Sequence, residues 1–420
     1  MLAGDAPNGP MSVSRIGEEA DVVRDLDFQL VLLAAVLVPL GNGLMSPILD
    51  TLIGPFGASP ASIGLVISVF LVPSIVIMPI VGVLADRIGR KPIIVGSLVL
   101  FGLSGAAISL TTDFRVVLGL RFLQGIGWGS LTPLIITALG DFYSGSREAT
   151  AQGLRLSGSS VAASGFSLLS GAIVVLAWQY PFLLYLLALP IAVVVLVWLE
   201  EPTDSNDDAD GATSIWGYRD DLAALLSHRR VLTIVVARTL MIAVWIGFTT
   251  YNSIIVIRIL GGTPVLAGLL FAVATMAMAL GASQVGRATA FFGSRYTVLI
   301  LANAVLGLGF ATVALAPVLV LAGVGVVALG AAHGMAVSVY RSLITGFASE
   351  STRAGLVSLG EAGARVVATT APIVMGGIIA VMTAAVGFAD AVQLASLTVA
   401  AVAGGGGILL VVVARRAEPV

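Results

Sequence analysis

Long blocks of apolar residues follow one another along almost the whole chain, and short polar or charged stretches separate them. A helix needs about 20 mostly apolar residues to cross a bilayer. Twelve blocks of this kind lie near residues 28–53, 61–84, 92–111, 116–139, 150–178, 181–199, 231–257, 263–285, 296–316, 318–340, 355–380 and 385–413. The pattern therefore predicts an all-α membrane protein with twelve transmembrane helices.

The composition excludes a soluble protein, although 420 residues could form two or three soluble domains by length alone. Hydrophobic residues make up 58% of the chain and charged residues 10%, and the mean hydropathy is +1.06. A soluble domain has roughly 25% charged residues. Most of the 49 glycines lie inside the apolar blocks, where small residues let helices approach closely in lipid.

The distribution of cations predicts the orientation, because cytoplasmic loops of membrane proteins are enriched in Lys and Arg. With a cytoplasmic N-terminus, fifteen of the 21 cations fall on the cytoplasmic side. Two fall outside, Arg115 and Arg258, and four fall within spans, Arg121, Arg155, Arg238 and Arg365. We therefore expect a multi-pass protein of the cell membrane with both termini in the cytoplasm. Residues 1–26 are acidic where a secretory signal would be basic, which predicts a cytoplasmic tail.

Two of the predicted cytoplasmic turns resemble each other. GVLADRIGRKP occupies residues 82–92 and GRATAFFGSRY residues 286–296, with two glycines and one cation at matching positions. Arg147 after the fourth block likewise matches Arg353 after the tenth. Two six-helix bundles in the same orientation form a parallel repeat, which is a known transporter architecture.

The repeat also sets the predicted domain boundaries. We expect a tail at 1–26, a first bundle at 27–200, a cytoplasmic linker at 201–228, a second bundle at 229–414 and a tail at 415–420. Within the linker, residues 215–226 place apolar side chains roughly on one helical face. This predicts an amphipathic helix on the inner membrane surface, with an ordinary soluble helix as the alternative.

Two motifs carry a resemblance that covers nearly the whole chain. The loop Gly82–Lys91 reads GVLADRIGRK and matches the pattern G-x-L-A-D-R-x-G-R-K completely, and Arg121–Gly127 matches R-x-x-Q-G-x-G. With these motifs the chain resembles the major facilitator superfamily of secondary transporters. The efflux branch of that family also has G-P-x-x-G-G in the fifth span, and residues 165–171, GFSLLSG, depart from it.

The charged loop is interpreted as a conformational latch. The glycines Gly82 and Gly89 allow the tight turn. The resemblance implies that Asp86 faces the N-terminal end of the eleventh span, where unpaired amides favour an anion. It also implies an ion pair of Arg87 or Arg90 with Asp141, and Lys91 completes the motif. The alternative is that these cations only enforce the topology.

Charges within spans are costly, about 2.5–3.5 kcal/mol at the bilayer centre, so each needs a reason. Arg121 is expected to contact substrate or to serve proton movement, or else to cap backbone groups. Glu361 lies four residues before Arg365 on one helical face. It could neutralise Arg365, bridge to Arg155 across the bundles as a gate, or act as a protonatable coupling site.

Further polar residues are candidates for the substrate cavity. Arg238 has no acid near it in sequence, so it could meet an anionic group of the substrate, and His333 is either titratable or a packing residue. The resemblance implies that spans 1, 4, 7 and 10 line the cavity. The other candidates are therefore Asn42, Gln124, Trp128, Trp245, Thr249, Tyr251 and Asn252, each of which could equally bond helix to helix. Asp50 is expected at the membrane interface.

These features predict a secondary transporter that works by alternating access. The chain has no phosphate-binding loop, no cysteine and no His/Cys metal cluster, so we expect neither an enzyme nor a cofactor. The expected function is proton-coupled efflux, as an antiporter, of small amphipathic or drug-like compounds. The alternative is a carrier of an organic anion or other metabolite, by symport or uniport, and a remote one is a non-transporting sensor. The expected partners are a small-molecule substrate, protons and the lipid bilayer, with no nucleic acid, and we expect a monomer.

Overall fold

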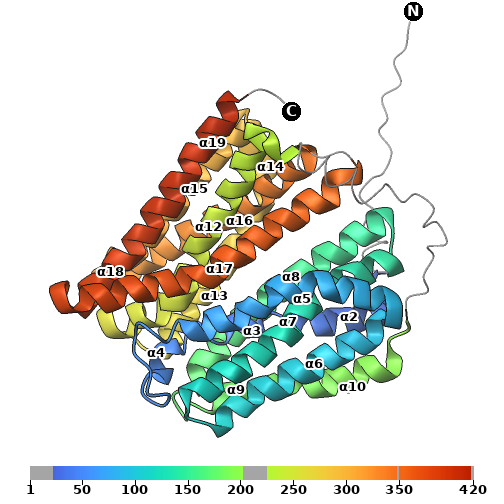
Figure 1. Ribbon diagram of the computed structural model, residues 1–420, viewed down its shortest axis with the longest axis horizontal. Coiled ribbons are helices and arrows are strands. Elements are labelled where there is room, and N and C mark those ends of the chain that lie inside the picture. The colour runs from blue at the N-terminus through green and yellow to red at the C-terminus, as the bar shows by residue number, and fades with distance from the viewer. Residues whose placement is uncertain (1–21, 202–224, 348–349, 418–420) are drawn as a thin grey trace, which may run out of the picture.

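The computed structural model describes residues 22–201, 225–347 and 350–417, and all of their regular elements are helices. Most of the amphipathic helix predicted at 215–226 lies outside these residues, as does the side chain of Asp86. Figure 1 shows two bundles, one from each half of the chain, that meet along helices from both. In the first half, Glu200 N near the end donates to Asp27 near the start, and in the second half Arg230 near the start donates to Ala417 O near the end. Figure 1 shows these ends on the same side of the molecule, which we call the terminal face.

The first bundle contains α2 (Leu26–Leu37), α3 (Leu40–Gly43), α4 (Leu49–Leu52), α5 (Leu65–Ile88), α6 (Arg90–Ala107), η1 (Ile108–Leu110), α7 (Phe114–Phe142), α8 (Gly145–Ile173), α9 (Tyr180–Leu183), η2 (Leu184–Leu187) and α10 (Ala188–Trp198). The second contains α12 (Arg229–Ile254), η3 (Ile255–Ile259), α13 (Pro264–Ser283), α14 (Val285–Phe292), α15 (Arg295–Leu315), α16 (Leu319–Phe347), α17 (Glu350–Val386), α18 (Phe388–Val399), η4 (Ala400–Gly405) and α19 (Gly406–Arg416).

The twelve predicted spans are all present in the described part of the chain. Eleven helical segments are long and apolar enough to cross a membrane, and α5 supplies the twelfth with a shorter apolar stretch, Leu65–Met78. Some predicted boundaries were wrong. The tenth span continues to Phe347 in α16, so that Arg341 lies within a helix and not in a loop. The turn predicted at 286–296 contains most of a short helix, α14, which contacts α15 and α16 and ends at Gly293 in the left-handed conformation.

The first span is broken into α2, α3 and α4, and Pro39 and Pro47 lie at the breaks. Carbonyl groups freed by such breaks must find partners inside the protein, because lipid offers none. Side chains of other helices supply them. Trp128 Nε1 donates to Val38 O at 2.9 Å, Tyr185 donates to Leu40 O at 3.2 Å, and Ser170 donates to Leu44 O at 2.6 Å.

The two bundles pack closely on the face opposite the termini. There α8 packs against α13 and α5 against α17. Ser164 and Thr275 hydroxyls lie 2.7 Å apart across the first contact. Beside the second, a Cβ at Gly376 of α17 would lie 2.2 Å from the O atom of Ala61 in the turn before α5, so only glycine allows this approach. The opposite face is therefore closed.

The same helices separate towards the terminal face. A cavity of about 760 Å³ lies there between α8, α13 and α16. Its lining residues include Leu156, Ser157 and Ser160 of α8, Met278 of α13, and Arg341 of α16. The structure is thus open to the terminal face and closed on the opposite face.

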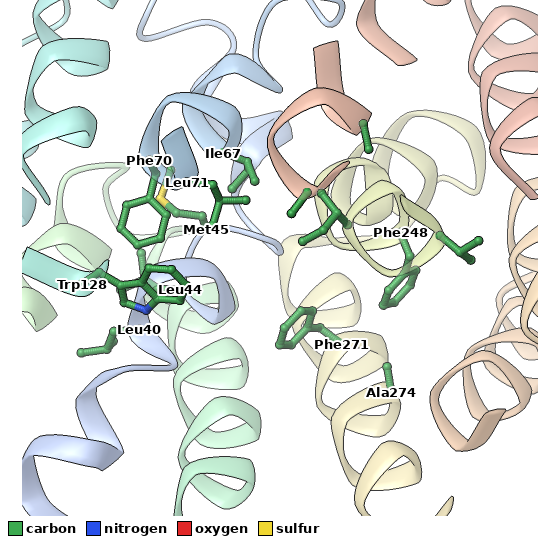
Figure 2. Packing of buried hydrophobic residues seen from close by; sticks show 14 of the residues in the cluster. Leu40, Leu44, Met45, Ile67, Phe70, Leu71, Trp128, Phe248, Phe271 and Ala274 are labelled. Atoms are coloured by element: carbon green, nitrogen blue, oxygen red, sulfur yellow. The ribbon is translucent and has the colours of Figure 1, made fainter. Parts of the chain in front are cut away.

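Apolar side chains pack on both sides of the bundle interface (Figure 2). In the first bundle, Phe70 and Trp128 rings pack with their centroids 5.1 Å apart. In the second, Phe271 of α13 and Phe248 of α12 are buried. The buried apolar residues of the two bundles form one continuous cluster, which crosses the interface where α8 packs against α13 and α5 against α17.

Gly376→Ala is expected to weaken closure of the opposite face, because overpacking costs about 1–3 kcal/mol. The chain has no cysteine, so a single Ser253→Cys, at a buried position on this face, can report opening by maleimide labelling. Labelling should become at least about fivefold faster with Gly376→Ala. The matched control is Gly377→Ala, whose Cβ would meet nothing within 4 Å. Equal labelling in both variants would contradict the proposed role of the close contact.

Candidate functional site

Three arginines and the only carboxylate predicted inside a span lie together in the second bundle. Glu361 Oε1 of α17 lies 2.5 Å from Arg238 Nη2 of α12 and 3.8 Å from Arg341 Nη2 of α16. The Arg238 side chain is 8% exposed and that of Glu361 38% exposed, so the carboxylate is the part that the opening reaches. Arg365 is close enough to interact electrostatically with Glu361 and with Arg238.

Glu361 forms ion pairs with Arg238 and Arg341 and, in the described structure, none with Arg365 or Arg155. The expected ion pair with Arg365 is therefore replaced by one with Arg238, which has no acid near it in sequence. A bridge to Arg155 would close this face, which is open here, so that gate stays a prediction. The reason lies in the packing of α12 against α17, which buries Arg238 and leaves Glu361 as its available counter-ion. Sequence spacing within one helix could not show this contact between helices.

Arg365 instead reaches across to the first bundle. Its guanidinium carbon lies 4.7 Å from the centroid of the Trp128 ring in α7. Trp128 borders a cavity of about 190 Å³, which is also lined by Asn42, Thr132 and Arg155. Arg155 donates to Gln152 at 3.0 Å and lies close enough to Arg341 for the two charges to repel each other. Three guanidinium groups of the second bundle thus lie near one carboxylate, and Arg155 of the first bundle lies near one of them, Arg341.

Arg121 lies apart from this cluster. It is fully buried and donates to Val66 O and Gly41 O at 3.1 Å each, and to Gln124 Oε1 at 2.6 Å. Its guanidinium also lies over the Phe70 ring at 4.0 Å. These contacts are all within the first bundle and tie the broken first span to α5 and α7. A role of Arg121 in coupling stays a prediction.

The remaining cavity candidates divide into two groups. Trp245 and His333 stack with their centroids 4.7 Å apart, and His333 lies near Arg238, so they adjoin the charged cluster. Asn42 and Trp128 line the smaller cavity described above. The others are buried and bonded to protein groups: Gln124 to Arg121, Thr249 to Ile246 O, Tyr251 to Pro372 O and Asn252 to Ala267 O. Substrate contact by any of them stays a prediction.

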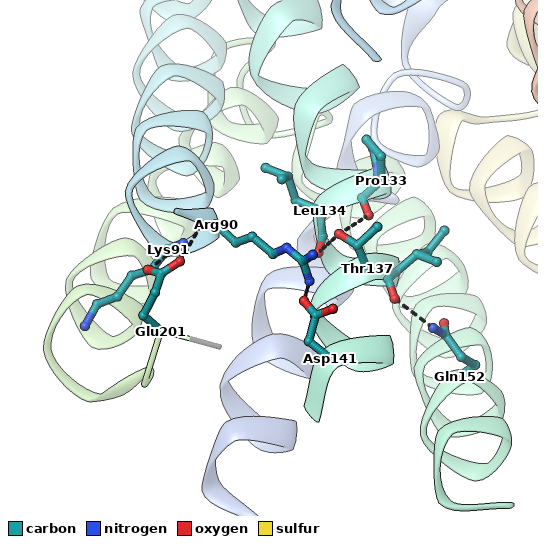
Figure 3. Close-up of polar contacts among 9 residues, drawn as sticks. Arg90, Lys91, Pro133, Leu134, Thr137, Asp141, Gln152 and Glu201 are labelled. Atoms are coloured by element: carbon teal, nitrogen blue, oxygen red, sulfur yellow. Dashed lines mark hydrogen bonds and ion pairs between the residues drawn. The ribbon is translucent and has the colours of Figure 1, made fainter. Parts of the chain in front are cut away.

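The charged loop joins three helices of the first bundle (Figure 3). Gly89, at φ +89°, turns the chain from α5 into α6. Arg90 pairs with Asp141 at the end of α7, as predicted for one of the two arginines of the loop. Glu201 accepts from the amides of Arg90 and Lys91, the latter at 3.2 Å, which the sequence did not indicate. The contact of Asp86 with the eleventh span stays a prediction.

An ion pair on the opposite face was also missed. Asp50 Oδ1 of α4 lies 2.5 Å from Arg258 Nε of η3, and the Asp50 amide donates to Ser253 Oγ at 3.1 Å. This pair joins the two bundles, and Asp50, which was expected to be merely interfacial, is only 10% exposed. One signal was available: Arg258 is one of two cations placed on the outer side, where arginine is disfavoured.

Sequence comparison identifies the family to which this architecture belongs. The family model described as Major Facilitator Superfamily matches residues 31–256, which is more than half of the chain. The chain therefore belongs to the major facilitator superfamily. It is a multi-pass membrane transporter and not an enzyme.

Several known proteins are similar over part of the chain. The bacillibactin exporter of Bacillus subtilis is 32% identical over 124 residues, covering 28% of this chain and 31% of the exporter. The quinolone resistance protein NorA of Staphylococcus aureus is 29% identical over 113 residues, covering 27% of this chain and 29% of NorA. The chain thus matches less than a third of the length of each of these relatives.

Solved structures are similar over almost the whole chain. A bacterial homologue of the human lysosomal transporter Spinster, in an inward-facing and occupied conformation, has a TM-score of 0.79 at 16% identity, covering 93% of this chain and 96% of the other. A D-xylose–proton symporter has a TM-score of 0.75 at 13% identity, covering 96% and 98%. These likenesses establish the fold of two six-helix bundles.

Asp50→Asn is expected to loosen the opposite face, because it removes the ion pair with Arg258 that joins the bundles there. Maleimide labelling of Ser253→Cys should become faster, and the exchanged pair Asp50→Arg with Arg258→Asp should restore the slow rate. If the exchanged pair labels as fast as Asp50→Asn, the ion pair does not hold this face closed.

Arg121→Gln is expected to lower the thermal stability of the protein, because it leaves the carbonyls of Gly41 and Val66 without donors. Each buried unsatisfied group costs about 1–3 kcal/mol. Arg121→Lys keeps the charge, but an ammonium group cannot reproduce the planar set of donors that a guanidinium presents to both carbonyls. This variant should therefore also be destabilised. Thermal unfolding in detergent measures both, and wild-type stability in Arg121→Gln would contradict this interpretation.

Proposed function

We propose that the chain is a proton-coupled secondary transporter that exports small amphipathic or drug-like compounds from the cell. In this proposal it resides in the cell membrane as a monomer, with both termini in the cytoplasm. The terminal face is then the cytoplasmic face, and the structure is an inward-open state. The excess of cations in the loops of this face supports the orientation.

The observation that carries the proposal is the ion pair of Glu361 with Arg238 beside the opening. A carboxylate within a membrane span is costly unless it is paired or neutralised by a proton. Glu361 can therefore exist in two stable forms, ionised and bound to Arg238, or protonated and released from it. These two forms are what proton coupling requires.

The charges around Glu361 indicate how a proton would act on the conformation. Arg155 belongs to the first bundle, whereas Arg238, Arg341 and Arg365 belong to the second. Closing the terminal face brings Arg155 towards these three, and ionised Glu361 reduces the repulsion between them. Protonation of Glu361 removes that compensation and favours the open terminal face. A proton taken up from outside would thus return the carrier to its inward-open state, as antiport requires.

The relatives support the direction of transport. The bacillibactin exporter and the quinolone resistance protein NorA each match a part of this chain, and their names describe removal of a compound or resistance to it. Efflux by this chain is consistent with that similarity.

A second candidate function is transport of an organic anion. The region beside the opening holds four arginines, of which Arg341 lines the cavity, against one carboxylate, and Nη1 of Arg238 is buried without a hydrogen-bond partner in the described structure. This excess of positive charge would attract an anionic group and repel a cation. An anion bound near Arg155 would also reduce the repulsion between the bundles and so permit closure of the terminal face.

Proteoliposomes with a pH dye trapped inside test both candidates. Rhodamine 123 and fluorescein share an aromatic core but differ in charge, so they serve as the cationic and anionic probes. The export candidate predicts that rhodamine 123 moves protons in the wild type and that Glu361→Gln abolishes this signal. An anion carrier that works by proton symport predicts the same with fluorescein. Asp390→Asn, at an acid far from the cluster in sequence, is the control and should keep it.

The outcomes separate the candidates. Proton movement with rhodamine 123 supports the export of cationic drug-like compounds, whereas movement with fluorescein alone supports the anion carrier. Dye transport without any proton signal would contradict proton coupling. Proton signals of equal size in the wild type and in Glu361→Gln would exclude Glu361 as the coupling residue.

A further inference from the structure

A basic pocket lies on the terminal face, away from the opening between the bundles. It has a volume of about 410 Å³ and lies where α12 begins and α19 ends. Its lining includes His228, Arg229, Arg230 and Arg416. No described carboxylate forms an ion pair with any of these three arginines, so the pocket carries an uncompensated positive charge.

Arg230 forms a fixed wall of this pocket. It donates to Ala414 O at 3.1 Å and to Ala417 O at 2.5 Å, and its guanidinium lies 5.8 Å from the centre of the Tyr296 ring. These contacts hold the end of α19 beside the start of α12. Arg229 and Arg416 are exposed and remain available to a ligand.

The start of α12 adds backbone donors to these charges. His228 occupies the N-cap position and makes no side-chain capping hydrogen bond. The first amides of a helix and its dipole both favour an anion, and phosphate groups bind well at such ends. The pocket therefore combines guanidinium groups with an uncapped helix terminus, which is a suitable environment for a phosphate group.

The surface below the pocket is apolar and exposed, which distinguishes a lipid from a soluble phosphate. On α12, Leu232 and Val236 follow Arg229 by three and seven residues, so they lie on its face, and they are 47% and 38% exposed. On α19, Leu409 precedes Arg416 by seven residues and is 64% exposed. Arg238 lies about half a helical turn round from Arg229, so this stripe faces away from the Glu361 cluster.

We propose that this pocket binds the phosphate headgroup of an anionic phospholipid, with the acyl chains lying along the apolar stripe of α12 and α19. Arg229 and Arg416 bind the phosphate, the first turn of α12 donates amides to it, and Arg230 keeps the two helices in register. The lipid thereby joins the first and last spans of the second bundle. This site is independent of the substrate and of the proton.

Native mass spectrometry of the purified full-length chain tests the site with phosphatidylglycerol and phosphatidylcholine as probes. We expect the wild type to retain phosphatidylglycerol in preference to phosphatidylcholine. Arg229→Gln with Arg416→Gln should weaken phosphatidylglycerol binding about tenfold to thirtyfold, as expected for the loss of two cations near an anionic headgroup. Arg147→Gln with Arg87→Gln removes the same charge from the first bundle and should leave binding unchanged.

Equal weakening in both double variants would show general attraction to the basic face and would overturn the proposal. Displacement of phosphatidylglycerol by inorganic phosphate at similar concentration would show a phosphate site without lipid recognition, and would also overturn it. Amide exchange in the wild type gives a test that needs no variant. Phosphatidylglycerol should slow exchange in the first turn of α12, and phosphatidylcholine should not; equal exchange with both would contradict the site.

Discussion

The balance between one carboxylate and four guanidinium groups is the interaction on which the rest of the structure depends. Glu361 pairs with Arg238 and lies near Arg341, while Arg155 faces them from the other bundle. Like charges on two bodies that move relative to one another oppose the closure of the gap between them. Because Glu361 is the counter-charge beside that gap, we propose that its protonation state influences which face of the protein is open.

This balance acts on two bodies that are held together at a single end. Small residues bring the bundles into backbone contact on the opposite face, as Gly376 does against Ala61, and Asp50 pairs with Arg258 there. Many of these contacts are made by backbone and small side chains at close approach. The closed face can therefore separate without unfolding either bundle.

Within each bundle, by contrast, the membrane requires that polar backbone groups be satisfied internally. The broken first span meets this requirement through Trp128, Tyr185, Ser170 and Arg121, which donate to its free carbonyls. Arg121 thus contributes to holding the first bundle as one rigid body. A residue conspicuous in the sequence as an intramembrane charge serves the backbone, and Glu361 provides the charge that faces the opening.

The sequence was sufficient for the number of spans and the two bundles, because hydropathy and the repeat depend on local composition. It also indicated that Arg90 or Arg87 would meet Asp141, because a motif specified that contact. It did not indicate that Glu361 meets Arg238, since that depends on how α12 rotates against α17. Asp50 with Arg258, and Glu201 with the start of α6, were missed for the same reason: each joins helices far apart in sequence, and no local pattern marks the partners.

Distances between pairs of spin labels, measured by double electron–electron resonance, test the central claim that the charge state of Glu361 controls which face is open. The chain has no cysteine, so labels can be placed at Ser157 and Ser342 beside the terminal-face cavity, and at Val175 and Val265 on the opposite face. The account predicts that Glu361→Gln lengthens the first distance, shortens the second and removes any dependence on pH. If Glu361→Gln populates a closed terminal face as much as the wild type does, the charge balance does not control the conformation.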